Sequence, residues 1–139
     1  MAATAGIAGF GTLLKRSGTT VAEVTDISGP TLSRDTIDMT HHQSPNRWRE
    51  FIKNVKDGGE VTFSINYIPT NATHATGTGV LADFANDTTN DTWTLVFPDS
   101  GATTWTFPGF ITKFTPKEPV DDKLSADLTI KVSGQPTLA

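Results

Sequence analysis

The chain has 139 residues and no cysteine, which excludes a disulfide framework, a thiolate metal site and a thiol nucleophile. Its formal net charge of −4 argues against a domain that grips phosphate groups, because such a domain needs clustered Lys and Arg. A chain of this length is about one domain long, so one hydrophobic core is expected.

The first 20 residues show neither the helical nor the strand period. They contain four glycines, and no basic residue precedes their apolar positions. No apolar run is long enough for a signal or membrane helix. We therefore predict a flexible arm over residues 1–20 that becomes ordered against a neighbour, no membrane insertion, and synthesis in the cytoplasm.

Two strands are expected next, over residues 21–27 and 32–39. Between them stand Ser28, Gly29 and Pro30, and a Gly-Pro pair is typical of a turn. The pattern predicts that the two strands form one hairpin.

Residues 44–57 change to the helical period. Ser44 followed by Pro45 is typical of a helix start, and Asp57, Gly58 and Gly59 are typical of a helix end. The apolar positions in between follow the spacing i, i+3, i+4, i+7, and they are Trp48, Phe51, Ile52 and Val55. We expect these four side chains to anchor a helix on a sheet.

Strand patterns then resume. Residues 61–67 alternate between apolar and polar, a short helix or turn is expected near 78–86, and residues 92–97 and 103–107 form a hairpin around Pro98 to Gly101. The chain continues into a strand over 110–115. The last strand, from Leu124 to Ser133, alternates strictly, which is typical of a half-buried strand.

Together these elements predict an all-β dominated fold, a β-sandwich or barrel of about seven strands with one flanking α-helix. We expect a single domain over residues 21–133, between the arm at 1–20 and a tail at 134–139. No internal repeat or domain linker is visible in the sequence.

Chemical motifs are weak throughout. Residues 77–82 match the dinucleotide pattern G-x-G-x-x-A without a preceding strand, and the adjacent His41 and His42 would point to opposite faces of an extended segment. We expect no catalytic site, metal site or cofactor. A carbohydrate-binding β-sandwich stays open as an alternative, because aromatic faces can stack on sugar rings; its candidates are Trp93, Trp105, Phe107 and Phe110.

Several segments resemble the major tail tube protein of long-tailed, lambda-like bacteriophages (siphoviruses). They are residues 24–30 (VTDISGP), 44–52 (SPNRWREFI), 57–61 (DGGEV), 94–99 (TLVFPD) and 118–137, and the similarity extends over about residues 7–137. The resemblance implies a structural virion protein that forms hexameric rings. The rings stack into a tail tube around a tape-measure protein, between a tail terminator and tail-tip proteins, and genomic DNA later passes through without specific binding.

Within this resemblance two sets of residues are candidates for roles. An acidic bore would repel phosphate, and its candidate lining is Asp35, Asp38, Glu60 and Asp127. Contacts between subunits or with solvent are expected from the polar faces of the predicted helix, namely Arg47, Arg49, Glu50 and Lys53. The tube of a contractile tail or of a type VI secretion-like system is a second alternative.

Overall fold

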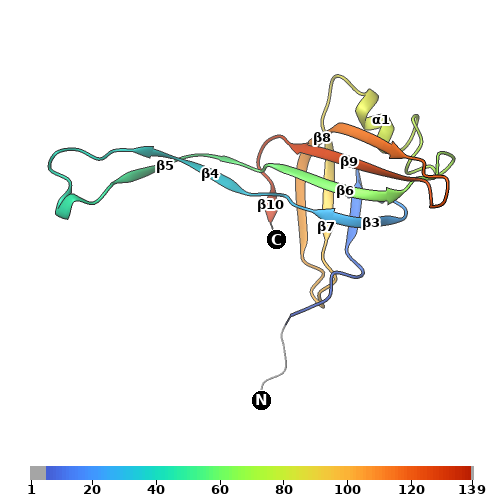
Figure 1. Cartoon of the computed structure of the whole chain (residues 1–139), viewed down its shortest axis with the longest axis horizontal. Helices are drawn as coiled ribbons and strands as arrows, with labels where there is room; N and C mark the ends of the chain where they lie inside the picture. Colours follow the sequence, from blue (N-terminus) through green and yellow to red (C-terminus); the bar gives the residue numbers. More distant parts are fainter. Residues whose placement is uncertain (1–5, 139) are drawn as a thin grey trace, which may run out of the picture.

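Two crossed layers of antiparallel strands and one long projecting hairpin make up the fold (Figure 1). The computed structural model describes residues 6–138. The strands are β1 (Leu13–Arg16), β2 (Thr19–Thr20), β3 (Val24–Ser28), β4 (Ser33–Asp38), β5 (Phe51–Asp57), β6 (Glu60–Asn66), β7 (Asp91–Val96), β8 (Thr104–Lys117), β9 (Ser125–Val132) and β10 (Thr137–Leu138). A single 3-10 turn, η1 (Pro45–Arg47), and one helix, α1 (Val80–Ala85), complete the described elements.

The long strand β8 belongs to both layers. Its residues 104–109 pair with β7, and β10 pairs with Trp105 and Thr106 from the other side. Its residues 109–117 pair with β9, with a register shift between Ile111 and Lys113. The strand order is β2-β1-β7-β8-β9-β6-β3, so β8 turns the corner between two sheets that cross (Figure 1).

The core lies between the two layers. Trp93 and Phe107 of one layer are fully buried, as are Ile65 and Ile130 of the other, and the rings of Phe63 and Trp93 approach across the interface with their centroids 6.4 Å apart. The burial of β9 alternates without exception, and β6 follows the same period. The predicted β-rich fold, the alternating strands at 61–67 and 124–133, the hairpin at 92–107 and the helix near 78–86 are therefore confirmed.

The predicted hairpin between residues 21–27 and 32–39 is wrong. Both strands exist, but β3 pairs with β6, and β4 pairs with β5. Gly29 has a φ of +102° and lies so close to the Glu60 carbonyl that a Cβ would clash with it. The Gly-Pro pair therefore leads the chain past β6 and out of the body, instead of folding β4 back on β3.

The arm prediction is wrong for its second half. Residues 13–16 form β1, which pairs with β7, and Leu14 is fully buried in the core. The short strand β2 then pairs back on β1. Residues 1–5 lie outside the described residues. At the other end, the predicted tail contributes β10 to the sheet.

The predicted helix over residues 44–57 is also wrong. Only Pro45–Arg47 makes a 3-10 turn, and Asn46 and Arg47 have positive φ values of 55° and 63°, which end it at once. Ser44 donates its hydroxyl proton to the Glu50 side chain instead of capping helical amides. From Phe51 onward the aromatic and β-branched residues favour a strand, and they form β5.

The four proposed helix anchors consequently have no sheet beneath them. Their exposed fractions are 74% for Trp48, 51% for Phe51, 49% for Ile52 and 69% for Val55. The apolar residues of 48–55 match helical spacing by chance. Both faces of β5 are exposed, so no buried face determines where its apolar residues fall.

Candidate assembly surfaces

Three surfaces stand out on the molecule: the outer face of one layer, the projecting hairpin, and a pocket beside the N-terminal segment. The layer formed by β3, β6, β9 and the second half of β8 turns its apolar side chains inward. Its outer side, here called the polar face, is rich in hydroxyl and charged groups. It comprises Asp26, Ser28, Glu60, Thr62, Ser64, Asn66, Lys113, Thr115, Lys117, Ser125, Asp127, Thr129 and Lys131, placed by cross-strand pairing.

The polar face brings together two of the four predicted bore residues. Glu60 and Asp127 lie on it, on the neighbouring strands β6 and β9. Asp35 and Asp38 do not, because they belong to the hairpin. Sequence reasoning missed Asp26, which lies opposite Ser64 on β3. The signal was present, since Asp26 alternates with the apolar Ile27 in the same way as its neighbours in β6.

Two of the three lysines of the polar face form ion pairs with carboxylates, and the third, Lys113, forms none within residues 6–138. Lys117 Nζ lies 2.6 Å from Asp127 Oδ2, and Ser64 donates its hydroxyl proton to Asp127 Oδ1 at 2.7 Å. These hydrogen bonds, that of Lys117 first, hold the pKa of Asp127 below its ordinary value. Lys131 Nζ lies 3.4 Å from Asp57 Oδ1. A face on which two of three cations are already paired with carboxylates binds phosphate weakly.

Both edges of this layer lack a pairing strand within residues 6–138. β3 ends the strand order on one side, and on the other side the second half of β8 pairs only with β9. The helix α1 covers β8 at one point, where the Ile111 amide donates to Asp83 Oδ2 at 2.7 Å. Beyond that point residues 112–117 present an open backbone edge, which is a site for pairing with another chain.

The hairpin of residues 33–57 projects far from the two layers (Figure 1). Every residue of β4 and β5 is exposed. The register places Ile37 opposite Ile52 on one face, and Asp38 opposite Phe51 on the other. Unpartnered apolar side chains on an ordered two-stranded ribbon indicate an interaction surface, because such a ribbon is marginally stable alone.

The tip of the hairpin, residues 39–50, is fixed by polar contacts around Glu50. The Glu50 carboxylate accepts a hydrogen bond from Ser44 at 2.7 Å and lies 3.3 Å from His41 Nδ1, while its amide donates to Thr40 Oγ1 at 2.9 Å. The Met39 amide donates to the Glu50 carbonyl. Glu50, predicted as a contact residue, thus holds the tip together. Arg47 and Arg49 extend from the tip, and Lys53 lies on β5.

The base of the hairpin is built from glycines. A Cβ on Gly58 would clash with the Val132 side chain, and one on Gly59, whose φ is +69°, would clash with the Thr31 carbonyl. The two connecting segments therefore pack closely against each other and against β9. A depression of about 750 Å³ lies beside this base, with Leu32, Val55 and Leu138 among its lining residues.

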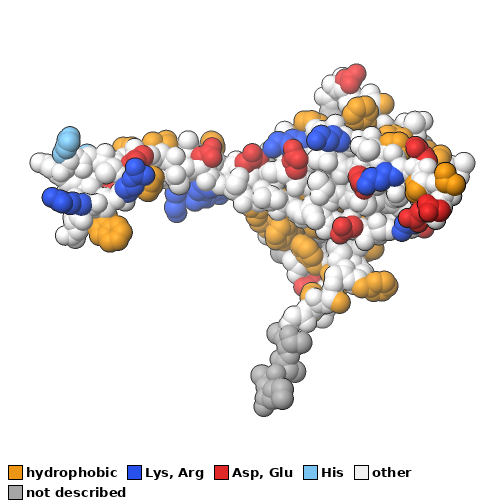
Figure 2. All heavy atoms as spheres, viewed as in Figure 1, with side chains coloured by type: hydrophobic (Ala, Val, Ile, Leu, Met, Phe, Trp, Pro, Cys, Tyr) orange, Lys and Arg blue, Asp and Glu red, His pale blue; other side chains and the backbone are white. Residues whose placement is uncertain are grey.

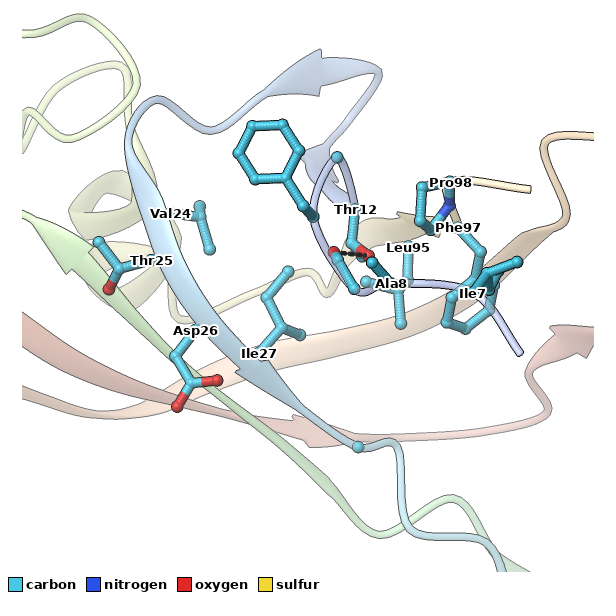
Figure 3. Close-up of a pocket in the computed structure, with 14 residues that line it drawn as sticks. Ile7, Ala8, Thr12, Val24, Thr25, Asp26, Ile27, Leu95, Phe97 and Pro98 are labelled. Carbon is cyan, nitrogen blue, oxygen red and sulfur yellow. Dashed lines mark hydrogen bonds between the residues drawn. The ribbon is translucent and has the colours of Figure 1, made fainter. Parts of the chain in front are cut away.

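The third surface is a half-open pocket of about 550 Å³ beside residues 7–12, here called the N-terminal pocket (Figure 3). The segment 7–12 forms one wall and β3 the other, and Ile27 points from β3 towards the N-terminal segment, whereas Asp26 points away. Leu95, Phe97 and Pro98 close the base. Asp26 is the single charged residue in the lining.

A buried polar cluster joins α1 to the sandwich. Asp83 is 2% exposed, and its Oδ1 atom has no hydrogen-bond donor. Burial, aided by a hydrogen bond to Asp91, raises the pKa of Asp83 to about 7. Burial alone would also raise the pKa of Asp91, but hydrogen bonds with Asp83 and with Arg16, whose Nε lies 2.6 Å away, hold it below its ordinary value. Burial and the neighbouring Asp91 carboxylate therefore favour the protonated form of Asp83.

The sites weighed for small ligands do not assemble. Trp93 and Phe107 are fully buried, and Trp105 packs edge-to-face on Phe97. Of the four aromatic residues named for sugar stacking only Phe110 is exposed, at 36%, so they form no shared platform. His74 is buried, accepting from the Ile68 amide at Nδ1, with Nε2 2.7 Å from the Ala22 carbonyl. In residues 6–138 no cluster of three metal-ligating side chains occurs, and no helix there is long and apolar enough to span a bilayer.

Comparison with known proteins gives a consistent result. A family model described as "Lambda phage tail tube protein, TTP" matches residues 9–139. No curated protein matches the chain.

Solved structures match over nearly the whole chain. A protein in the virion of a native gene transfer agent particle aligns with a TM-score of 0.77 at 18% identity, covering 96% of this chain and 99% of that one. A chain from the sheath/tube terminator of an extracellular contractile injection system aligns with a TM-score of 0.75 at 13% identity, covering 99% of both chains. A chain in the tail of an empty gene transfer agent particle with C6 symmetry aligns with a TM-score of 0.73 at 17% identity, covering 96% of this chain and 99% of that one.

Proposed function

Because this chain belongs to the lambda phage tail tube protein family, we propose that it forms its tube by joining the β3 edge of one copy to the β8 edge of the next. It is a structural component of a virion tail, and membership in a structural family argues against an enzyme. The observation that carries the proposal is the pair of open edges on opposite sides of one layer.

Strand direction supports this joint. All pairings from β3 through β6 and β9 to β8 are antiparallel, so β3 and β8 run in opposite directions. When copies are related by rotation about an axis along the strands, β3 of one copy meets β8 of the next in antiparallel orientation. Repetition of such a head-to-tail contact closes a ring when the rotation closes.

Charge supports the same joint. The β3 edge carries Asp26, and the open part of β8 carries Lys113, which forms no ion pair within residues 6–138. Opposite charges across an interface fix its register and favour the correct partner. The C6 symmetry of a similar tail makes a hexameric ring the expected closure.

In this arrangement the polar face lines the bore. Its hydroxyl groups, its carboxylates Asp26, Glu60 and Asp127, and the ion pairs of Lys117 and Lys131 suit a conduit through which genomic DNA slides without specific binding. We leave Asp35 and Asp38 out of the bore because the hairpin lies outside the polar face. A tape-measure protein would occupy the bore during assembly in the host cytoplasm, and terminator and tail-tip proteins would close its ends.

The exposed hairpin, residues 33–57, is the second assembly surface. Its apolar side chains on both faces are explained by contact with neighbouring subunits, in the same ring or the next. This role replaces the predicted helix, and it keeps the expectation that Arg47, Arg49 and Lys53 contact other subunits.

Negative-stain electron microscopy of the purified protein over a concentration series tests the function. Rings or hollow tubes are expected, and monomers at every concentration, even with a tape-measure protein added, would contradict it. The edge joint is tested by mixing Thr25→Cys and Thr115→Cys variants, since the natural chain has no cysteine. Disulfide-linked dimers are expected from this pair, and none from Thr25→Cys mixed with Val120→Cys.

A contractile tail or injection system is the second candidate. It is favoured by the similarity to chains from extracellular contractile injection systems, including a sheath-tube complex. A sheath protein that binds assembled tubes would support it, and bare tubes in intact virions would exclude it.

A further inference from the structure

The open edge of β8 begins beside α1. The pairing of β7 with β8 ends at Asp91, opposite Gly109, and the chain reaches β7 from α1. Just beyond this point the Ile111 amide donates to Asp83 Oδ2 at 2.7 Å. The Asp83 carboxyl group therefore takes the place that a backbone carbonyl of a longer β7 would fill.

This hydrogen bond is buried, because both Asp83 and Ile111 are buried residues. A buried amide needs an acceptor, since an unpaired one destabilises the fold. An amide has only one hydrogen to donate, so no strand of another chain can bond to the Ile111 amide while Asp83 does. The stretch of β8 that can pair with a second copy therefore starts after Ile111.

The other end of the open edge is limited as well. The register of β8 against β9 shifts between Ile111 and Lys113, which is typical of a β-bulge and interrupts the ladder. Pro116 has no amide hydrogen to donate. Between the bulge and the proline stand residues 113–115, so the edge offers only a short stretch for pairing, as protected sheet edges do.

Side-chain faces favour one register for β3 of a second copy. Ile27 of β3 and Phe114 of β8 are both half-buried and pack against the core from opposite ends of the layer. A joint that continues the layer must keep inward side chains opposite one another, so Ile27 has to meet an inward residue of β8. The amide of Ile111 is already bonded, and Pro116 has none. Phe114 remains.

The charges agree with this register. Asp26 of one copy then lies opposite Thr115 of the next, with Lys113 as its diagonal neighbour, within reach of a long side chain. Lys113 forms no ion pair within residues 6–138, whereas Lys117 is paired with Asp127. Figure 2 shows side chains of both charges over β6 and β9, the middle strands of this layer, so no excess of one sign there repels a second copy.

We propose that Asp83 is a register stop for assembly: by bonding the Ile111 amide, it makes β3 of a second copy pair farther along β8. In the resulting register Ile27 of one copy lies opposite Phe114 of the next. The proposal rests on the edge joint proposed above and deepens it by naming the residue that fixes its register. Asp83 is a positioning residue, since it acts through β8 of its own chain. A single register gives every subunit the same rotation, which closure of a ring requires.

Amide hydrogen exchange of the natural protein tests the register. In the monomer the Ile111 amide should exchange slowly, and those amides of residues 113–115 that point away from β9 should exchange fast. In assembled tubes exchange of the latter should slow about tenfold or more, because they join hydrogen bonds between chains. Tubes in which residues 113–115 exchange as fast as in the monomer would overturn the proposal.

Cysteine cross-linking tests the role of Asp83. Thr25→Cys should give more disulfide-linked dimers with Thr115→Cys than with Lys113→Cys, because Thr25 lies nearer to Thr115 in the proposed register. Asp83→Ala in both partners frees the Ile111 amide and lets β3 slip towards it. Dimers with Lys113→Cys should then rise at the expense of those with Thr115→Cys. Asp83→Asn is the matched control, since its side-chain oxygen still accepts from the Ile111 amide, and it should keep the natural ratio.

The outcomes separate this proposal from the tube function. If Asp83→Ala folds, as judged by its melting curve, and keeps the natural ratio of the two dimers, the register stop fails alone. If Asp83→Ala does not fold, hydrogen exchange in tubes of the natural protein decides. If the natural chain forms tubes but neither cysteine pair cross-links, the edge joint fails too. If it never forms rings or tubes, the proposed function fails as well.

Discussion

The sandwich and the hairpin of this protein differ in where their apolar side chains lie. In the sandwich, fourteen apolar side chains are buried in one cluster, and strand periodicity reports directly on the core. In the hairpin, no residue of β4 or β5 is buried, yet large apolar residues are common. The comparison teaches that the two regions serve two different equilibria: the sandwich residues determine folding of the monomer, and the hairpin residues are free to determine assembly.

The largest effect on folding is expected in the sandwich core. Trp93→Ala should lower the free energy of unfolding by about 3–5 kcal/mol, because it removes a fully buried aromatic ring that contacts Phe63. Urea unfolding measures this directly. The matched variant is Trp48→Ala in the hairpin, which should change the same free energy by less than about 0.5 kcal/mol. Comparable losses of unfolding free energy in the two variants would show that the hairpin contributes to folding as much as the core does.

A smaller effect is expected at the polar cluster under α1. Arg16→Met removes the guanidinium that contacts Asp91 and leaves two neighbouring carboxyl groups without a cation. We expect a loss of about 1–3 kcal/mol in the free energy of unfolding, since a partly buried charge loses its partner. Lys117→Met breaks an exposed pair with Asp127 and serves as the control, with a loss below about 1 kcal/mol. Equal losses would show that burial of the cluster is unimportant.

The same cluster should make the sandwich sensitive to pH. The pKa of Asp83 is raised from 3.8 to about 7 in the folded protein, so between these values the folded state binds a proton that the unfolded state lacks. This contribution to stability is complete at low pH and is lost as the pH rises through about 7.

Asp83→Asn tests this titration. The amide is neutral at every pH, can accept from the Ile111 amide and can donate to Asp91, so the variant should lose the decline in stability around pH 7. Urea unfolding of both proteins between pH 5 and 8 measures the difference. If the unfolding free energies of the two proteins change with pH in the same way, groups other than Asp83, the histidines first, cause the pH dependence.

The smallest effect on folding is expected from removal of the hairpin. Replacement of residues 33–57 by a short Gly-Ser linker should leave the unfolding free energy of the body nearly unchanged, because β4 and β5 pair only with each other. Tube formation should be lost. A body that unfolds on removal of the hairpin would show that the two regions are energetically coupled.

The division also explains what could be predicted from the sequence. β6 and β9 were predicted from alternation because one of their faces is buried, and the hairpin β7–β8 from its turn residues. Residues 44–57 were predicted as a helix because Trp48, Phe51, Ile52 and Val55 match helical spacing, but no buried face selects between the periods there. Leu14 was missed because β1 is too short to show any period.

The candidate surfaces, too, could be predicted only where a buried face fixes the register of a strand. Of the four residues named for the bore, only Glu60 and Asp127 share a face in the structure, because they lie on strands whose register the core fixes. The edge of β8 and the N-terminal pocket could not be predicted, because both arise from contacts between segments far apart in the sequence. The prediction of a tail tube protein depended on similarity over the whole chain, and the family model confirms it.

The shared strand β8 has a mechanical consequence. It runs from the layer with β7 into the layer with β9 without a break in the chain. A pulling force applied to one layer, as when a long tail bends, therefore reaches the other through covalent backbone and not only through side-chain contacts. The two layers of each subunit should yield together under load, so the weakest links along a strained tube would be the joints between subunits.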